Sequence, residues 1–211
     1  MMPTREEMRE ALNQRHGKKF QDKIALAHIA ICGLGGLGSH IAIALARTGI
    51  GHLHLIDFDR VDLTNLNRQN YNVHQIGLYK TEALQETLTT IAPYCEIRID
   101  TIEITSENIA ALLKQDMIIC EAFDRPEAKA MLAEGVLQVF PEKYFIASSG
   151  MAGIFSANTI QTRQISSKFY VCGDEVSDSK EGIGLVAPRV MVCAAHQANM
   201  VLRIIAGEIA P

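Results

Sequence analysis

Short apolar runs alternate along this chain with longer segments in which apolar residues recur every three or four positions. The short runs have the length and composition of β-strands; they are Ala27–Cys32, His52–Ile56, Glu96–Thr101, Met117–Cys120, Tyr144–Ser148 and Thr159–Ile165. The periodic segments predict helices at Leu37–Thr48, Lys80–Ile91, Ser106–Lys114, Arg125–Val139 and Pro188–Ala206. This alternation predicts an α/β fold, a doubly wound and mostly parallel sheet with helices on both faces.

The ends of the chain and its longest loop extend this picture. Thr4 and Glu7 have the spacing of a capping box and open an N-terminal helix that runs to about Arg15. Residues 1–22 then form a helical extension of one domain spanning residues 1–211, because a chain with 48% hydrophobic content can bury a single core. Ser166–Ala187 is rich in serine, glycine and aspartate and predicts a long loop that serves as a functional lid.

Four glycines follow the first predicted strand directly: Gly33, Gly35, Gly36 and Gly38. Gly33 permits a tight turn, and the missing side chains at Gly35 and Gly36 let backbone N–H groups approach a phosphate. Gly38 lets the next helix pack closely on the sheet, and the positive end of that helix faces the same point. The pattern predicts a Rossmann-like nucleotide site; the alternative is a glycine-rich turn that serves packing only.

The acids and cations after the second strand bear on which nucleotide binds. Asp57 ends that strand, where an acid can bind ribose hydroxyls, and on this evidence alone an NAD-dependent oxidoreductase fits. The polar segment that follows contains more functional groups than a dinucleotide requires: Asp59, Asn67, Arg68, Gln69 and then Lys80. Acids can hold magnesium or ribose and cations can neutralise phosphate oxygens, so the segment favours a nucleoside triphosphate with a metal ion.

Asp124 lies between the run Met117–Cys120 and the helix predicted to begin at Arg125. Local sequence predicts that Asp124 caps this helix, with Glu127 completing a capping box. Its place after a strand, at the edge where ligands bind to parallel sheets, equally suits a functional role in the site. Both interpretations stay open, since a cap position at the crevice allows both roles.

Together these motifs resemble the ThiF/MoeB/HesA family of ubiquitin-activating-like adenylyltransferases. The resemblance covers roughly residues 20–207 and is carried by Gly33–Gly38, Asp57–Asp59, Asn65–Gln69, Lys80, Glu121–Asp124, Ser148–Gly153, Tyr170–Asp174 and Ala187–Val190. The later segments are most similar to the short, zinc-free ThiF-type enzymes that adenylylate a ThiS-type sulfur carrier in thiamine biosynthesis. One departure is Lys129, which stands where relatives often have an arginine.

The resemblance implies an activity and a role for each polar residue. It implies that the enzyme uses ATP and Mg²⁺ to adenylylate the C-terminal carboxylate of a small ubiquitin-like carrier, and that it forms a homodimer. Arg68 and Lys80 would neutralise phosphate oxygens, and Asn67 would orient one of them. Asp59 would hold ribose or metal, and Asp124 would hold magnesium near the α-phosphate.

Three further positions carry hypotheses from the same resemblance. Ser149–Gly153 consists mostly of small residues, which suit a slender carrier tail or, alternatively, a tight turn. Cys172 is a candidate catalytic residue, because related enzymes can hold the carrier on a cysteine; the alternative is a small apolar side chain that closes a strand. Arg15 is the nearest candidate for an arginine supplied by a partner subunit, the alternative being an exposed helix arginine.

Composition narrows the partners and the compartment. A net charge of −4 and a pI of about 6.0 indicate no general affinity for nucleic acid or acidic membranes. No apolar run approaches the ~20 residues that cross a bilayer, and the polar N-terminus is unlike a secretory signal, so we expect a cytoplasmic protein. The five cysteines include no Cys-x-x-Cys pair, which predicts neither a disulfide framework nor a zinc site.

We therefore expect an ATP-dependent adenylyltransferase for a ThiS-type carrier. One alternative is a superfamily relative that acts on another carrier or on a modified tRNA, although the charge balance weighs against tRNA. A second is an NAD-dependent oxidoreductase, against which the Asn67–Gln69 cluster and the lack of a second substrate domain weigh. A third is a non-catalytic nucleotide-dependent binding module, which the presence of Arg68, Lys80 and Asp124 disfavours.

Overall fold

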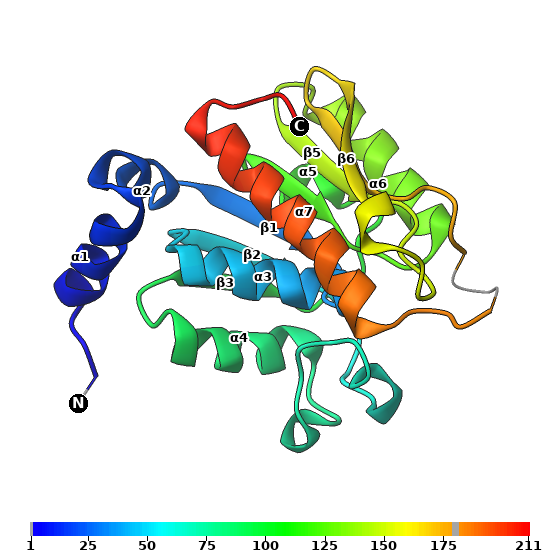
Figure 1. The fold of residues 1–211 in the computed structure, drawn as a ribbon, viewed down its shortest axis with the longest axis horizontal. Coiled ribbons are helices and arrows are strands. Elements are labelled where there is room, and N and C mark those ends of the chain that lie inside the picture. The colour runs from blue at the N-terminus through cyan, green and yellow to red at the C-terminus, as the bar shows by residue number, and fades with distance from the viewer. Residues whose placement is uncertain (1, 179–181) are drawn as a thin grey trace.

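The fold, seen in a computed structural model that describes residues 2–178 and 182–211, is built on one seven-stranded sheet (Figure 1). The strand order is β3-β2-β1-β4-β5-β7-β6, and every neighbouring pair is parallel except β6 with β7. The strands are β1 (His28–Cys32), β2 (His52–Ile56), β3 (Glu96–Asp100), β4 (Ile118–Glu121), β5 (Tyr144–Ser148), β6 (Gln161–Ser166) and β7 (Phe169–Gly173). The predicted α/β fold with a mostly parallel sheet is confirmed.

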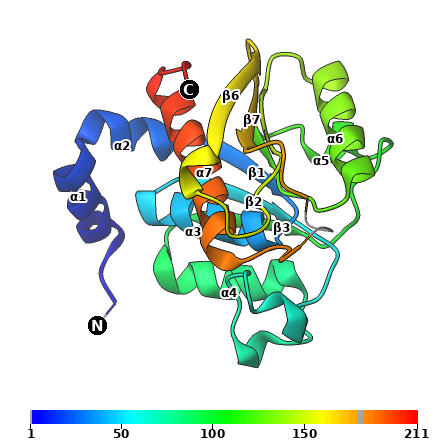
Figure 2. The same cartoon turned by 45° about the vertical axis from the view of Figure 1, so that its right-hand side comes forward.

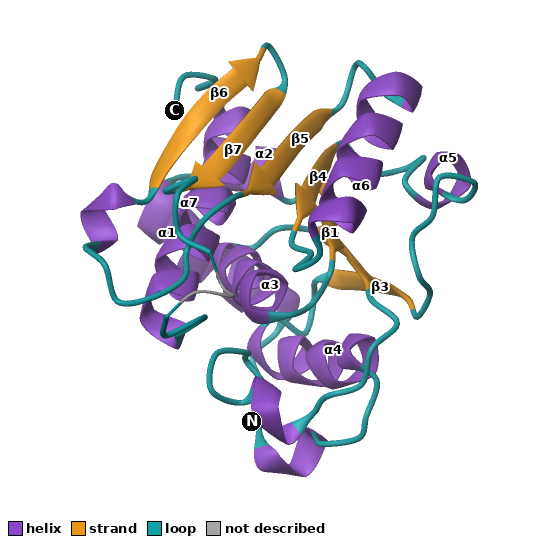
Figure 3. Cartoon of the chain, turned by 90° about the vertical axis from the view of Figure 1, so that its right-hand side faces the viewer, coloured by secondary structure: helices purple, strands orange, loops and turns teal. Residues whose placement is uncertain are grey.

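Helices cover both faces of this sheet (Figure 3). One face carries α3 (Gly36–Thr48), α4 (Lys80–Ile91) and α7 (Ala187–Ala206), which share one hydrophobic core. The other carries α5 (Ile109–Leu112) and α6 (Pro126–Val139), which enclose a second, smaller core. Short 3₁₀ helices at Leu63–Asn65, Val73–Gln75 and Ala157–Thr159 lie in the connections.

Strand β1 shows why its sequence is apolar throughout. Side chains alternate between the two faces of a strand, so Ile29 and Ile31 enter the core under α3 and α7, whereas Ala30 and Cys32 enter the core under α6. All four side chains are fully buried. A parallel strand covered on both sides needs this continuous apolar run, and it ends at the start of the glycine loop.

The N-terminal helices lie at one side of the molecule. Helix α1 (Arg5–His16) begins with the predicted capping box, in which Thr4 accepts from the Glu7 N–H and Glu7 accepts from the Thr4 N–H. None of its residues is buried, and in Figure 2 it stands apart from the sheet. Helix α2 (Lys18–Ile24), which was not predicted as a separate element, joins α1 to the domain and contacts α7.

Two predicted elements differ from the structure. The expected loop Ser166–Ala187 begins instead with the second half of the β6–β7 hairpin (Figure 2), and residues 179–181 lie outside the described residues. The helix predicted at Ser106–Lys114 shortens to α5, because Asn108 bonds back to the Thr105 N–H and the Glu103 carbonyl instead of extending the helix. Among the described helices, none has both the length and the apolar composition that a membrane span requires.

Candidate active site

A cleft of about 890 Å³ opens at the carboxyl ends of the parallel strands. Its walls are the turns after β1, β2, β4 and β5, together with the segment after β7. Nine of the predicted site residues line it: Gly33, Gly35, Gly36, Asp57, Asp59, Arg68, Gln69, Lys80 and Asp124. The other three, Gly38, Asn67 and Cys172, are not among its lining residues. The cleft therefore brings most of the predicted site together in one place, as expected for a doubly wound sheet.

Gly33 and Gly38 are required because a side chain there would meet backbone atoms. Gly33 has a φ of +93°, and a Cβ there would lie 2.8 Å from the carbonyl oxygen of Ala122. A Cβ on Gly38 would lie 1.9 Å from the carbonyl oxygen of Gly33, so the glycine brings the first turn of α3 onto the loop. Gly38 thus shapes the site without lining it, in agreement with its predicted packing role.

The other two glycines differ from each other. At Gly35 a Cβ would meet only the Gln69 side chain, 3.7 Å away, so this position is open toward the cleft. At Gly36 a Cβ would lie 2.9 Å from Val190 of α7, so packing alone requires a glycine there. Gly35 is the N-cap of α3, whose first N–H groups have no partner within the helix and are free to bind an anion.

Asp57 fixes the glycine loop. Its carboxylate accepts hydrogen bonds from the backbone N–H groups of Leu34, at 2.6 Å, and of Asp59, at 2.8 Å. Burial raises the pKa of Asp57, and the nearby Lys80 ammonium and these two N–H groups oppose that rise. The residue that the sequence suggested for ribose binding therefore also orients the turn above it.

Lys80 pairs with both acids after β2. Its Nζ atom lies 2.7 Å from the carboxylate of Asp59 and 3.9 Å from that of Asp57. The lysine is buried, whereas the Asp59 side chain is half exposed. Its backbone N–H also donates to the Asp59 carbonyl, which ties the start of α4 to this turn. The arrangement places an ammonium group in the wall of the cleft.

Arg68 is held at the cleft by its own segment. Its guanidinium donates to the Asn67 side chain at 2.9 Å and to the Thr64 carbonyl at 3.3 Å. Asn67 in turn donates to the carbonyl of Leu185, so it links this segment to the chain before α7 instead of facing the cleft. Gln69 is buried, and its Oε1 atom has no hydrogen-bond partner among the described residues.

The structure does not support the capping interpretation of Asp124. Arg125 is the N-cap residue of α6, and no side-chain hydrogen bond caps the helix. The residue before a proline favours an extended backbone, so Pro126 places the helix start one residue later than expected. Asp124 lies exposed at the cleft, where its carboxylate makes no hydrogen bond or ion pair within the described part of the chain. It is thus available to a metal ion.

Sequence reasoning missed an ion pair at this end of the cleft. Glu121, the last residue of β4, is fully buried, and both of its carboxylate oxygens lie within 3.0 Å of Lys129 Nζ. Burial raises the pKa of Glu121, and Lys129 opposes that rise. Glu121 was visible only as part of the family motif, since nothing in the local sequence pairs it with a lysine eight positions later.

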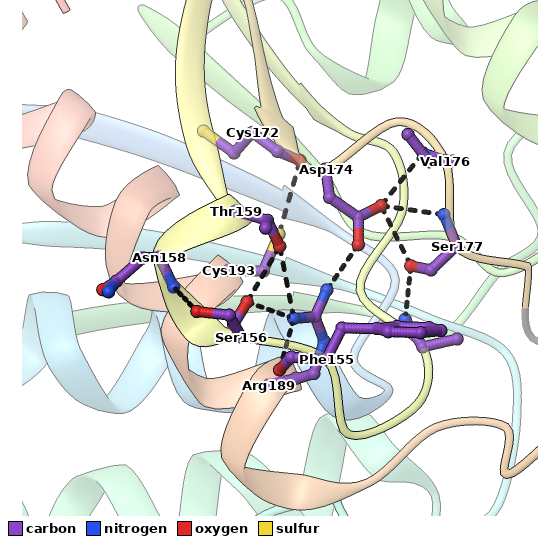
Figure 4. A network of polar contacts seen from close by, with 11 residues as sticks. Phe155, Ser156, Asn158, Thr159, Cys172, Asp174, Val176, Ser177, Arg189 and Cys193 are labelled. Carbon is purple, nitrogen blue, oxygen red and sulfur yellow. Dashed lines mark hydrogen bonds and ion pairs between the residues drawn. The ribbon is translucent and has the colours of Figure 1, made fainter.

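A second network holds residues 174–177, part of the segment that follows β7 (Figure 4). The buried Arg189 of α7 forms an ion pair with Asp174 and donates to the carbonyl oxygens of Phe155 and Ser156. Asp174 also accepts from the backbone N–H and hydroxyl of Ser177. The motif around Arg189 therefore anchors two loops on the first turn of α7.

The expectation of a loop over Ser166–Ala187 is wrong at Cys172. The cysteine is within β7, its side chain is fully buried, and it does not line the cleft. Desolvation raises the pKa of the thiol to about 11. Its Sγ atom lies 3.5 Å from the hydroxyl of Thr162 on the neighbouring strand. These contacts describe a packed strand residue, the alternative that the sequence left open.

The remaining candidates divide between the cleft and the N-terminal helix. Ser149, Gly150, Met151 and Ala152 line the cleft beside the end of β5, whereas Gly153 is not among the lining residues. Arg15 is exposed on α1 and does not line the cleft of its own chain.

Three comparisons with curated proteins give the following similarities. The tRNA threonylcarbamoyladenosine dehydratase of Escherichia coli is 39% identical over 56% of this chain and 44% of the relative. The molybdopterin-synthase adenylyltransferase of Escherichia coli is 28% identical over 89% of this chain and 76% of the relative. The ubiquitin-like modifier-activating enzyme 5 of Xenopus laevis is 42% identical over 40% of this chain and 21% of the relative. The chain thus spans less than half the length of some of these relatives.

Solved structures share the fold over nearly the whole chain. The Escherichia coli tRNA N6-threonylcarbamoyladenosine dehydratase TcdA in complex with AMP superimposes with a TM-score of 0.84, covers 94% of each chain and is 24% identical. The same protein in complex with ATP gives a TM-score of 0.85. At this identity the likeness shows the fold. The ThiF family matches residues 8–211, which confirms the resemblance seen in the sequence: the chain is a member of the ThiF family.

Proposed function

We propose that this protein is an ATP-dependent adenylyltransferase that activates a substrate carboxylate as an acyl adenylate. One observation carries the proposal: a single cleft holds the open N-terminus of α3 at Gly35, the cations Arg68 and Lys80, and the free carboxylate of Asp124. An anion-binding helix end, phosphate-neutralising cations and a metal ligand are the groups that nucleotidyl transfer requires. The family relatives that are adenylyltransferases by name support the same activity.

The chemistry needs positioning more than it needs a base. The substrate carboxylate is already ionised near neutral pH, attacks the α-phosphorus of ATP, and the bond to pyrophosphate breaks. The protein must hold two anions together and screen their charge. Gly35 and the first N–H groups of α3 bind phosphate in this proposal, Arg68 and Lys80 neutralise its oxygens, and Asp59 binds ribose hydroxyls.

Asp124 fits a magnesium ion, because its carboxylate is exposed in the cleft and has no partner among the described residues. The ion supplies charge neutralisation of the phosphate oxygens when bound. Asp124 contributes one carboxylate ligand; phosphate oxygens and water complete the coordination that Mg²⁺ prefers.

We propose a modified tRNA nucleoside as the substrate. Two curated relatives that are 39% and 41% identical to this chain bear the name tRNA threonylcarbamoyladenosine dehydratase, and they favour this alternative over a ThiS-type carrier. A threonylcarbamoyl group ends in a free carboxylate, the group that an adenylyltransferase activates. After activation, a nucleophilic group of the same nucleoside attacks the acyl carbon, and AMP leaves with one carboxylate oxygen. The nucleoside has then lost the elements of one water molecule, which is a dehydration.

A ubiquitin-like carrier is the second candidate. The relative that aligns over 89% of this chain is named molybdopterin-synthase adenylyltransferase, and the small residues Ser149, Gly150 and Ala152 line the cleft. They leave room for an extended C-terminal peptide. Both candidate functions use the same adenylation step and differ only in the substrate that carries the carboxylate.

ATP–pyrophosphate exchange separates these functions. The protein is incubated with ATP, Mg²⁺ and labelled pyrophosphate, and with threonylcarbamoyl-modified tRNA, the same tRNA without the modification, a ThiS-type carrier, or no substrate. We expect exchange with the modified tRNA alone. Exchange with the carrier alone identifies the second candidate, and absence of exchange with every substrate contradicts adenylation and favours a binding module.

Calorimetry tests the choice of nucleotide independently of any substrate. We expect MgATP to bind with a micromolar dissociation constant, about −8 kcal/mol, and NAD to bind far more weakly. Tight NAD binding without ATP binding would support an oxidoreductase instead.

A further inference from the structure

Glu121 is a buried acid that the proposed chemistry does not use. It ends β4, is 0% exposed, and does not itself line the cleft. Hydrophobic residues of similar volume are often at least as stable as a buried ion pair, so packing alone does not require this carboxylate. The atoms that it contacts suggest what it does.

Each oxygen of Glu121 holds a different wall of the cleft. Oε1 accepts a 2.6 Å hydrogen bond from the backbone N–H of Phe123, one residue before Asp124. Oε2 accepts a 3.2 Å hydrogen bond from the backbone N–H of Ser148, where β5 ends and the small-residue loop begins. A single rigid carboxylate thus links the turn that carries Asp124 to the loop that starts at Ser149.

Lys129 completes the link from the first turns of α6. Its Nζ atom lies 2.9 and 3.0 Å from the two oxygens of Glu121, and it donates to the hydroxyl of Ser148 at 3.0 Å and to the Ser148 carbonyl at 3.2 Å. An ammonium group has three protons, and these acceptors use them. Lys129 therefore serves as the counter-ion of Glu121 and has no proton left for a substrate.

We propose that Glu121, with Lys129 as its counter-ion, is a positioning residue that holds Asp124 and the Ser149–Gly153 loop at a fixed separation across the cleft. The inference rests on the proposed adenylation, in which the nucleotide's metal ion lies on the Asp124 side and the substrate enters along the loop. Displacement of reacting groups by about 1 Å can cost 10²-fold in rate. The pair thus sets the distance between the attacking carboxylate and the α-phosphorus.

Glu121→Gln tests this directly, because glutamine keeps the volume but offers one carbonyl oxygen as acceptor. We expect kcat of pyrophosphate exchange to fall by roughly 10–100-fold, as for other outer-shell groups that orient a ligand. The KM for ATP should stay within about twofold, because the hydrogen bonds of the Glu121 carboxylate go to Phe123, Lys129 and Ser148, none of which belongs to the glycine loop. Lys129→Arg should retain more activity than Glu121→Gln, because arginine can still donate to both carboxylate oxygens. The matched control is Glu134→Gln on the same helix α6, which should behave as wild type.

The double variant Glu121→Gln/Lys129→Met separates positioning from charge balance. Glu121→Gln alone and Lys129→Met alone each leave one buried group without its partner and should lower the thermal stability. The double variant removes both charges and should regain that stability, while its kcat stays as low as that of Glu121→Gln. Wild-type kcat in this double variant would overturn the proposal, because the pair would then only neutralise itself. Wild-type kcat in Glu121→Gln would overturn it as well.

Amide hydrogen exchange gives a readout that needs no substrate and no activity. In Glu121→Gln at least one of the Phe123 and Ser148 amides loses its acceptor, and its exchange should accelerate by about tenfold or more. Unchanged protection at both amides would overturn the positioning role even if adenylation itself were never observed. Accelerated exchange in a protein that adenylylates nothing would instead leave the positioning intact and contradict the proposed function.

Discussion

The carboxylate of Asp57 accepts a 2.6 Å hydrogen bond from the backbone N–H of Leu34, in the middle of the glycine loop. The Leu34 side chain is fully buried, so the loop is fixed from the core below and by the acid beside it. In the proposed function this loop offers its amides to a phosphate, and the two contacts hold it rigid before any ligand arrives, which lowers the entropic cost of binding.

Asp57→Asn should raise the dissociation constant of MgATP about tenfold, since a charge-assisted hydrogen bond is worth ~1.5–3 kcal/mol and asparagine can accept from only one of the two N–H groups. Burial raises the pKa of Asp57. When the wild type is acidified, its affinity for MgATP should therefore begin to fall at a higher pH than it would with an aspartate of ordinary pKa. Calorimetry from neutral to acidic pH measures both effects.

Asp62→Asn is the matched control for this change. Asp62 caps an exposed 3₁₀ helix in the next segment and does not line the cleft. Equal loss of ATP affinity in both variants would remove Asp57 from the binding site.

Arg68→Ala should lower the exchange rate by ~10² or more, because one preorganised group that stabilises developing charge is worth ~3 kcal/mol. The melting temperature should change little, since Arg68 is only partly buried and its guanidinium donates to one side chain and one carbonyl of its own segment. Exchange kinetics and thermal unfolding are measured on the same preparation. Arg60→Ala, outside the cleft in the same segment, should keep the wild-type rate.

Asp124→Asn should shift the magnesium requirement. Removal of Mg²⁺ with a chelator should abolish exchange in the wild type, and the variant should need a higher Mg²⁺ concentration for half-maximal rate because it offers the ion no carboxylate. A magnesium titration of the exchange rate tests this. The same Mg²⁺ dependence in both proteins would show that the ion binds elsewhere.

Much of this architecture follows from sequence pattern. The parallel strands and the glycine loop are predictable because β1 is apolar on both faces and Gly33–Gly38 follows it directly. Strand β7 was missed because its five residues end in Gly173 and lead into a polar run, which is typical of a loop. The predicted start of the helix after Asp124 was wrong by one residue, because Pro126 displaces the helix start.

The features that could not be predicted from the sequence are mostly tertiary contacts. The pair of Glu121 and Lys129 forms between a strand end and a helix turn, and each residue alone resembles an ordinary member of its element. The proposed substrate differs from the first expectation for another reason. A net charge of −4 averages the whole chain, whereas one modified nucleoside needs only a local site, so charge balance was weak evidence against tRNA.

Cys172 should be dispensable for chemistry. With a pKa of about 11, only about one thiol in a thousand is ionised at pH 8, and the side chain is buried. Cys172→Ala should keep the exchange rate within about twofold, and the native thiol should resist iodoacetamide until the protein is unfolded. Mass spectrometry after alkylation measures this. A covalent substrate adduct on a non-reducing gel that is lost in the variant would restore the catalytic hypothesis.

The last prediction concerns assembly and Arg15, which is exposed on a helix with no buried residues and does not line the cleft of its own chain. From the family resemblance we expect a C₂ homodimer in which Arg15 completes the partner's site. Light scattering at micromolar concentration should report a dimer, and Arg15→Ala and Asp124→Asn should each lower the rate of pyrophosphate exchange strongly.

When the two variants are mixed and allowed to exchange subunits, half of the dimers contain one subunit of each variant, and each of these dimers has one intact site. Activity should then return to about one quarter of wild type. An arginine that acts within its own chain gives no recovery on mixing, and a monomer in light scattering removes the trans site altogether.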